Sequence, residues 1–137
     1  MSAIVIDTSA VIAIIRAEFE ARRFIDAIAA ADTAYMSAVS LQESAMVLAG
    51  NSGDASAWHV LDDMVRDMDL QVAPHDYDLA IIAQDAFLQF GKGRHPAALN
   101  CGDCASYALA KRPDLPLLYK GRDFAQTDIA AVPSQPG

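Results

Sequence analysis

The sequence predicts an α/β fold in which a central, mainly parallel sheet lies between two layers of helices. Short apolar runs alternate along the chain with longer stretches whose apolar residues recur at helical spacing, and this order is typical of parallel sheets. The 137 residues can bury a core, and 53% are hydrophobic while 20% are charged, as in folded chains. Without repeats or linkers, we expect one domain over residues 1–132 and a frayed tail at 133–137.

The first expected strand is the continuous apolar run at residues 3–6, which is rich in β-branched side chains and is typical of a buried parallel strand. Asp7 follows it directly, at the strand end where open α/β sheets collect their ligands. Thr8 and Ser9 can cap the helix expected over residues 10–15. An ordinary turn or capping acid is an equally common role for Asp7.

The rest of the chain continues this alternation. We expect further helices at residues 18–31, 40–49, 55–68, 77–90 and 101–110, and strands at 35–36, 70–72 and 117–119. A last short edge strand is expected within residues 128–132. Four apolar residues at helical spacing are expected in the core, namely Trp58, Leu61, Val65 and Met68.

Glu43 has two interpretations, which depend on where its helix begins. A helix that begins at Ser40 makes Ser40-x-x-Glu43 a capping box, in which the carboxylate closes the helix N-terminus. A helix that begins at Ser37 places Glu43 two turns in, where its side chain is free to face a pocket.

Asp103 also has two interpretations. It lies in the stretch Asn-Cys-Gly-Asp-Cys-Ala-Ser-Tyr-Ala-Leu-Ala at residues 100–110. In the structural interpretation, Asn100 is an N-cap and Asp103 is an acid that favours the helix dipole. In the functional interpretation, Asp103 is one corner of an acidic pocket completed by Asp7, Glu43 and Asp123. Two of these acids follow strands and two belong to helices, positions that face one edge of a parallel sheet.

Four carboxylates at one edge predict a metal site. They would repel one another and raise one another's pKa values unless a cation lay between them. A site made of oxygen ligands suits Mg²⁺ or Mn²⁺. Such ions hold phosphates and activate water near neutral pH, which is what phosphodiester hydrolysis requires.

The cysteines give a weaker signal. Cys101 and Cys104 form one Cys-x-x-Cys, and a structural zinc site would need two more ligands, for which the three scattered histidines suggest no cluster. A thioredoxin-like redox motif is one interpretation, and two small thiols packed in a helix is the simpler one.

The charge distribution is uneven. The net charge of −8 argues against a general nucleic-acid binder. Residues 92–123, however, carry six basic residues against three acidic ones. This segment either holds phosphates beside the metal pocket or is a chance cluster on a solvated surface. Its basic residues are Lys92, Arg94, Lys111, Arg112, Lys120 and Arg122.

The sequence also bears on location. No apolar run approaches the length needed to cross a bilayer, and the N-terminus lacks the basic and apolar regions of a secretory signal. We therefore expect a cytoplasmic protein with no membrane contact.

Four segments carry a family resemblance, at residues 4–10, 37–43, 90–103 and 119–129. Together and in this order, they make the chain resemble the PIN-domain ribonucleases, most closely the VapC toxins of bacterial type II toxin–antitoxin pairs. Each motif is unspecific alone, but the ordered set covers almost the whole chain. The resemblance implies a PIN-domain-like α/β/α sandwich.

The resemblance further implies a Mg²⁺- or Mn²⁺-dependent endoribonuclease. The implied metal-binding acids are Asp7, Glu43, Asp103 and Asp123. The implied positioning residues are Ser9, Asn100 and Asp128. Candidate contacts to RNA phosphates are Lys92, Arg94, Lys120 and Arg122. In this family another small or acidic residue often lies near Arg122, so which acid of that turn reaches the metal stays open.

The resemblance also implies partners. The chain is expected to pair with a second copy of itself as a homodimer, and to bind a VapB-type antitoxin. The antitoxin inserts a segment into the active-site groove and carries a DNA-binding half. Any contact with DNA would then be indirect, through the antitoxin.

Three other functions share part of these features. A metal-dependent DNA or flap nuclease shares the site chemistry, but the chain is small and lacks a DNA-clamping arm. A non-catalytic RNA-binding or antitoxin-titrating PIN-like domain would be expected to lose one of the carboxylates. An aspartyl-phosphate phosphatase built on Asp7 would need an acid two residues later, where Ser9 stands.

Overall fold

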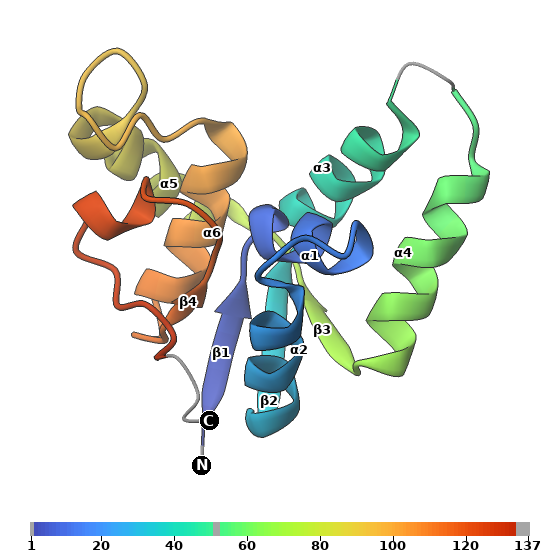
Figure 1. Cartoon of the computed structure of the whole chain (residues 1–137). Coiled ribbons are helices and arrows are strands. Elements are labelled where there is room, and N and C mark those ends of the chain that lie inside the picture. Colours follow the sequence, from blue (N-terminus) through green and yellow to red (C-terminus); the bar gives the residue numbers. More distant parts are fainter. Residues whose placement is uncertain (1, 51–52, 134–137) are drawn as a thin grey trace.

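The computed structural model describes residues 2–50 and 53–133 (Figure 1). Within them, the strands β1 (Ala3–Ile6), β2 (Thr33–Ser37), β3 (Leu70–Ala73) and β4 (Leu117–Leu118) form a parallel sheet in the order β3-β2-β1-β4. The expected parallel sheet is confirmed. Apart from Pro133, the tail predicted at 133–137 lies outside the described residues.

Helices cover both faces of the sheet, as predicted. They are α1 (Thr8–Ile15), α2 (Ala21–Ala30), α3 (Ala38–Ala49), α4 (Ser56–Asp67), α5 (Tyr77–Phe90), α6 (Cys101–Lys111) and a 3₁₀ turn, η1 (Phe124–Gln126). Side chains alternate along β1, so that Ile4 and Ile6 pack with residues of α1, α2 and α4, whereas Val5 packs with residues of α5 and α6.

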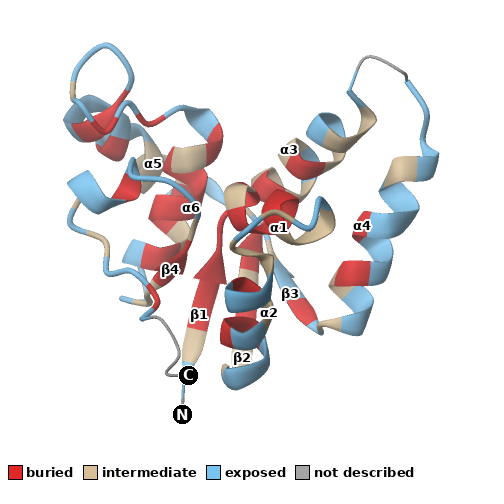
Figure 2. Ribbon diagram, in the orientation of Figure 1, coloured by how far each residue is buried: buried red, intermediate tan, exposed pale blue. Residues whose placement is uncertain are grey.

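The arrangement leaves one edge of the sheet framed by helix ends. Figure 1 shows β1 and β2 ending between α3 on one side and α6 on the other. Figure 2 shows that burial concentrates in β1 and along α6, whereas much of α4 is exposed. The carboxyl ends of the central strands therefore meet the first turns of α1, α3 and α6, where a parallel sheet places its site.

Two helix starts differ from the prediction. The N-cap of α1 is Asp7 itself, rather than Thr8 or Ser9, because its side chain accepts a hydrogen bond from the Ser9 N–H. The helix predicted from residue 18 begins only at Ala21, with Glu20 as its N-cap and residues 19–20 in a turn.

The start of α3 settles the question of Glu43. Ser37 is the N-cap, and its Oγ accepts a hydrogen bond from the Val39 N–H at 3.1 Å. A helix start at Ser40 is therefore wrong, and Glu43 has no capping role there. The alternative start at Ser37 is confirmed, and it leaves the Glu43 side chain free to face a neighbouring element.

Two other expectations were wrong. Trp58 is 44% exposed rather than in the core, because its Nε1–H reaches across to the Ala45 carbonyl (2.7 Å) and ties α4 to α3 at the surface. The strand expected within 128–132 is reduced to an isolated pairing of Leu117 with Ala131. Its neighbour β4 is only two residues long, so a longer strand would have nothing to pair with. In the described part of the chain, no helix combines the length and apolar character that a membrane crossing requires.

Candidate active site

Asp7 is held by hydrogen bonds on both carboxylate oxygens. Its side chain is buried at the end of β1, with a residue exposure of 3%. Oδ2 accepts from the Ser9 N–H (3.0 Å) and from the Ser9 hydroxyl (2.7 Å), and Oδ1 accepts from the Ser106 hydroxyl (2.6 Å). The capping and pocket interpretations of Asp7 are thus compatible, because the cap uses one oxygen and the other faces α6.

Asp103 also combines a structural role with a place beside other acids. It forms a capping box with Asn100, in which the Asn100 N–H donates to Asp103 Oδ2 (3.0 Å) and the Asp103 N–H donates to Asn100 Oδ1 (2.9 Å). Burial, with smaller contributions from the negative charges of Asp7, Glu43 and Asp123, raises the pKa of Asp103 to about 6 against the opposing effect of the Asn100 N–H. The four predicted acids therefore lie close enough to interact electrostatically.

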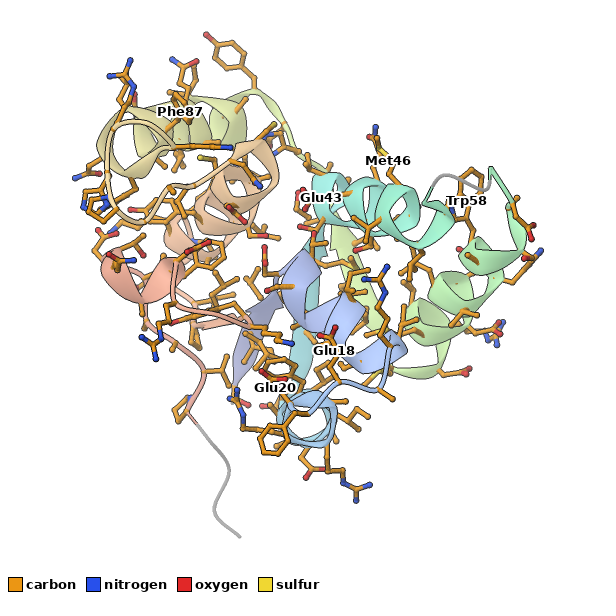
Figure 3. The ribbon with its side chains drawn as sticks, turned by 45° about the horizontal axis from the view of Figure 1, so that its top comes forward. Glu18, Glu20, Glu43, Met46, Trp58 and Phe87 are labelled. Carbon is orange, nitrogen blue, oxygen red and sulfur yellow. The ribbon has the colours of Figure 1, made fainter. Side chains whose placement is uncertain are left out.

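Glu43 reaches the site from α3. Its carboxylate lies directly against the first turn of α6, where a Cβ added to Gly102 would be only 2.6 Å from Glu43 Cδ. Figure 3 shows Glu43 on α3, and the contact with Gly102 places its carboxylate one residue from Asp103 along the chain. The absence of a side chain at position 102 is what lets α3 and α6 bring their acids together.

Asp123 is the most accessible of the four acids. It directly precedes η1, it is exposed, and its side chain does not cap that turn. Its neighbour Arg122 is exposed as well. Asp123 therefore has freedom to rotate, which the hydrogen-bonded Asp7 and Asp103 lack.

The four acids lie near one another, but their side chains do not form a complete metal-coordination site. Across residues 2–50 and 53–133, no three His, Cys, Asp or Glu side chains stand in a geometry that could hold a metal ion. The donor chemistry nevertheless fits a hard divalent cation, because all four groups offer carboxylate oxygens and the charge crowding on Asp103 is of the kind that a cation relieves. Side-chain rotation would have to complete the site.

The predicted positioning residues behave differently from one another. Ser9 donates to Asp7 and accepts the Lys120 N–H at 3.0 Å, so it links the turn after β4 to the site. Asn100 caps the helix of Asp103.

Asp128 instead contacts the far part of α6. It accepts hydrogen bonds from Lys111 Nζ (2.7 Å) and from the Tyr107 hydroxyl (2.5 Å). These two donors, with Lys111 the stronger, lower the pKa of Asp128. Its contacts tie the segment after η1 to α6.

The basic residues divide into paired and unpaired ones. Lys120 Nζ contacts Oε1 of Glu18 at 2.9 Å and Oε1 of Glu20 at 3.5 Å, and Figure 3 labels both glutamates. Lys111 pairs with Asp128, and Arg112 pairs with Asp76. Among the six basic residues at 92–123, the three that form no ion pair with any described residue are Lys92, Arg94 and Arg122, although Arg94 lies 5.9 Å from the centre of the Phe87 ring.

The two cysteines are free thiols. Cys101 is exposed and Cys104 is buried. Burial, with smaller effects from Asp103 and Cys101, raises the pKa of Cys104 to about 11, so the reactive thiolate is disfavoured. This counts against the redox interpretation and favours simple packing for Cys104.

Sequence reasoning missed two buried serines and a glycine. Ser40 and Ser106 are fully buried, and their hydroxyl oxygens are 3.1 Å apart. A signal existed, because Ser106 follows Asp103 by three residues and Ser40 precedes Glu43 by three, a spacing that puts each pair on one helix face. Gly102 carried no signal, because its importance depends on α3, far away in sequence.

A model of the PIN-domain family matches residues 4–130. The chain belongs to the PIN-domain family. Ribonuclease VapC28 of Mycobacterium tuberculosis is 42% identical to it over 126 residues, which cover 91% of this chain and 94% of that protein. This likeness places the chain among the VapC ribonucleases.

Solved structures agree on the fold. The crystal structure of M. tuberculosis VapC20, described as a sarcin-ricin loop cleaving toxin, superimposes with a TM-score of 0.75 at 17% identity and covers 94% of this chain and 98% of that one. A toxin–antitoxin complex from Klebsiella pneumoniae gives a TM-score of 0.67 at 16% identity, covering 96% of this chain and 98% of its counterpart. At these identities the similarity shows the shared PIN fold.

Proposed function

We propose that this chain is the toxin of a type II toxin–antitoxin system and cleaves RNA as a Mg²⁺- or Mn²⁺-dependent endoribonuclease, with residues 1–132 as one functional domain. The observation that carries the proposal is the contact of Glu43 with Gly102, which brings an acid of α3 beside the acid of α6 at the edge where β1 ends in Asp7. The 42% identity with proteins named VapC ribonucleases supports it.

In this proposal, the metal-binding acids are Asp7, Glu43, Asp103 and Asp123. A bound Mg²⁺ or Mn²⁺ would polarise the scissile phosphate and activate water for in-line attack. Asp7 presents oxygens whose orientation is fixed by three donors, and Asp103 presents a carboxylate fixed by the Asn100 cap. Asp123 is exposed and approaches from the solvent side. Ser9 and Asn100 act as positioning residues for the acids, whereas Asp128 positions the segment after η1 against α6, away from them.

The proposed contacts to RNA phosphates are Lys92, Arg94, Lys120 and Arg122. Three of them, Lys92, Arg94 and Arg122, are exposed and form no ion pair within the described chain. They can therefore bind a phosphate without first breaking an ion pair. Lys120 would have to exchange Glu18 and Glu20 for RNA. We expect Lys120 to contribute least.

We further propose a cytoplasmic protein whose partner is a VapB-type antitoxin, and that it meets DNA only through that antitoxin. The support is the fold shared with the toxin–antitoxin complex from K. pneumoniae and the family membership. Co-expression with a VapB-type antitoxin, followed by co-purification, tests the pairing.

A homodimer completes the proposal, and its candidate surface lies over α3, α5 and α6. A groove of about 610 Å³ there is lined mainly by apolar side chains, among them Val39, Ala83 and Phe87. Leu88, which lines the groove, is 62% exposed, and Met46, which lines a neighbouring hollow, is 63% exposed; Figure 3 labels Met46 and Phe87. A surface with both a hollow and protruding apolar groups suits a second copy related by a two-fold axis.

Charge favours the same occupant. The chain carries −8, so two copies repel over most of their surface. Helix α3 has one charged residue, Glu43, α5 has two, Asp78 and Asp85, and α6 has two of opposite sign, Asp103 and Lys111. This surface is therefore one on which like charges interfere little with self-association.

The test of the activity is direct. The purified, antitoxin-free protein is mixed with total RNA in Mg²⁺, in Mn²⁺ and in EDTA, beside Asp7→Asn and beside single-stranded DNA of matched length. Discrete RNA fragments that need the metal and vanish in the variant are the expected result. Preferential cutting of DNA would make the chain a DNA nuclease, and RNA binding without cleavage in any metal would make it a binding domain.

A further inference from the structure

Two buried serines connect three helices behind the site. Ser106 of α6 donates its hydroxyl proton to Asp7 Oδ1 (2.6 Å), and its oxygen lies 3.1 Å from the hydroxyl oxygen of Ser40 on α3. Both serines have an exposure of 0%. The Ser40 carbonyl also lies 3.5 Å from the Thr8 hydroxyl of α1. Ser40 therefore contacts both α1 and α6.

The direction of these hydrogen bonds follows from proton counting. A serine hydroxyl has one proton, and an ionised carboxylate only accepts. Because Ser106 gives its proton to Asp7, Ser40 must donate its own to Ser106. The chain Ser40 to Ser106 to Asp7 therefore has a single polarity, and each bond strengthens the next.

A second chain of the same polarity reaches the other oxygen. The Lys120 N–H donates to the Ser9 hydroxyl, which donates to Asp7 Oδ2. Both carboxylate oxygens of Asp7 are thus held by hydrogen-bond chains. The chain on Oδ2 begins at the turn after β4, and the chain on Oδ1 comes from α3 and α6. Ser9 and Ser40 lie within the segments that carry the family resemblance, whereas Ser106 lies outside them.

We propose that Ser106, oriented by Ser40, is a positioning residue that fixes the rotamer of the Asp7 carboxylate for metal binding. This rests on the proposed function. Such hydrogen bonds to a ligating carboxylate hold it in the binding geometry, and their loss costs about 10- to 100-fold in metal affinity or activity. In this chain the carboxylate is buried, so no solvent donor replaces the lost hydroxyl at Oδ1.

The chain supplies its own control in Ser44. It lies one turn after Ser40 on α3, it is equally buried, and its hydroxyl has no hydrogen-bond partner among the described residues. Replacing Ser44 by Ala removes the same atom from the same helix without touching Asp7. Ser40 and Ser44 therefore separate positioning from packing.

The experiment measures Mn²⁺ affinity by electron paramagnetic resonance, RNA cleavage with kcat and KM separated, and thermal unfolding in EDTA. The proteins are wild type, Ser106→Ala, Ser40→Ala and Ser44→Ala. We expect Mn²⁺ affinity and kcat to fall about 10- to 100-fold in Ser106→Ala, to fall less in Ser40→Ala, and to stay at the wild-type value in Ser44→Ala. KM for RNA should stay unchanged throughout.

Other outcomes overturn the proposal. Wild-type Mn²⁺ affinity in Ser106→Ala, with only a lower melting temperature, would make the serine structural. If Ser106→Ala does not fold, Ser40→Ala decides, and equality with Ser44→Ala would refute positioning. If the wild type itself neither binds Mn²⁺ nor cleaves RNA, the proposed function fails first and the positioning role with it.

Discussion

The Glu43 carboxylate occupies the space into which any side chain at Gly102 would project. This contact joins α3 to α6 and sets the distance between two of the four acids. A hydrogen atom at position 102 is therefore a requirement of the site, although the backbone there is ordinary helix.

We predict that Gly102→Ala separates stability from activity. The added methyl group would push the flexible end of Glu43 aside, while alanine favours the helix by about 1 kcal/mol over glycine. The free energy of unfolding should stay level or rise slightly, and RNA cleavage should fall by about 10-fold or more. Denaturant unfolding and a cleavage assay measure the two effects. Cys101→Ala, one residue away and exposed, is the matched control.

Full cleavage by Gly102→Ala would show that Glu43 works equally well from a displaced position. A strong loss of stability would show instead that the clash spreads into the packing of α3 against α6.

Asp103→Asn should alter the pH dependence of stability in EDTA. The folded state raises the pKa of Asp103 from 3.8 to about 6, so the folded protein binds the proton more tightly than the unfolded chain does. Stability from this group is present at low pH and is lost as pH rises from about 4 to about 6. The asparagine side chain still accepts the hydrogen bond from the Asn100 N–H, but it does not ionise. The stability of the variant should therefore not fall between about pH 4 and pH 6 through this group.

The expected size is modest because Asp103 is only partly buried. Two pKa units correspond to nearly 3 kcal/mol, which solvent screening reduces to about 1–2 kcal/mol. Urea unfolding at pH 4, 5.5 and 7 should show wild type and variant equal at pH 4, with the variant more stable at pH 7. A variant less stable than wild type at pH 7 would mean that the capping role outweighs the charge crowding.

Some of this site could be predicted from the sequence and some could not. The apolar run that ends in Asp7 and the Asn100 cap before Asp103 are local patterns, and both appear in the structure as expected. The start of α3 was ambiguous because both Ser37 and Ser40 can cap a helix. Tertiary structure decides it, since Ser40 is buried against Ser106, 66 residues away.

Contacts of long sequence separation account for the other misses. Ser106 acts on Asp7 across 99 residues, and neither position indicates the other. Trp58 fits a core pattern by spacing, but its indole N–H finds the Ala45 carbonyl at the surface. Periodicity predicts which side of a helix is apolar, and it does not predict which polar atom a neighbouring element will offer.

Asp7→Asn should abolish RNA cleavage with little loss of stability. The side-chain oxygen of the asparagine can still accept the hydrogen bond from the Ser9 N–H. Its NH₂ group can donate to the Ser106 hydroxyl, which then donates to Ser40, the reverse of the wild-type direction. The fold therefore keeps its hydrogen bonds while the site loses a charged ligand. We expect a loss of activity of about 100-fold or more, close to 3 kcal/mol in the barrier. Unfolding of the variant in EDTA would support a purely structural Asp7.

Asp128→Ala tests how far positioning extends from the acids. Asp128 binds Lys111 and Tyr107, so its removal frees the segment after η1 from α6 and should lower stability by about 1 kcal/mol. Because these contacts lie on the far part of α6, cleavage should stay within about two-fold of wild type under folding conditions. Loss of cleavage without loss of stability would show that Asp128 positions the site directly.

Leu88→Glu should convert a dimer into a monomer. Leu88 is 62% exposed and lines the apolar groove over α3, α5 and α6, and a glutamate there would place a charge from each copy into a desolvated surface. Val60→Glu is the matched control, because Val60 is 50% exposed on α4, outside this groove. Light scattering coupled to size-exclusion chromatography gives the mass of each protein. A monomeric wild type, or dissociation by Val60→Glu instead, would remove this surface as the dimer interface, because the apolar groove would then serve another partner or none.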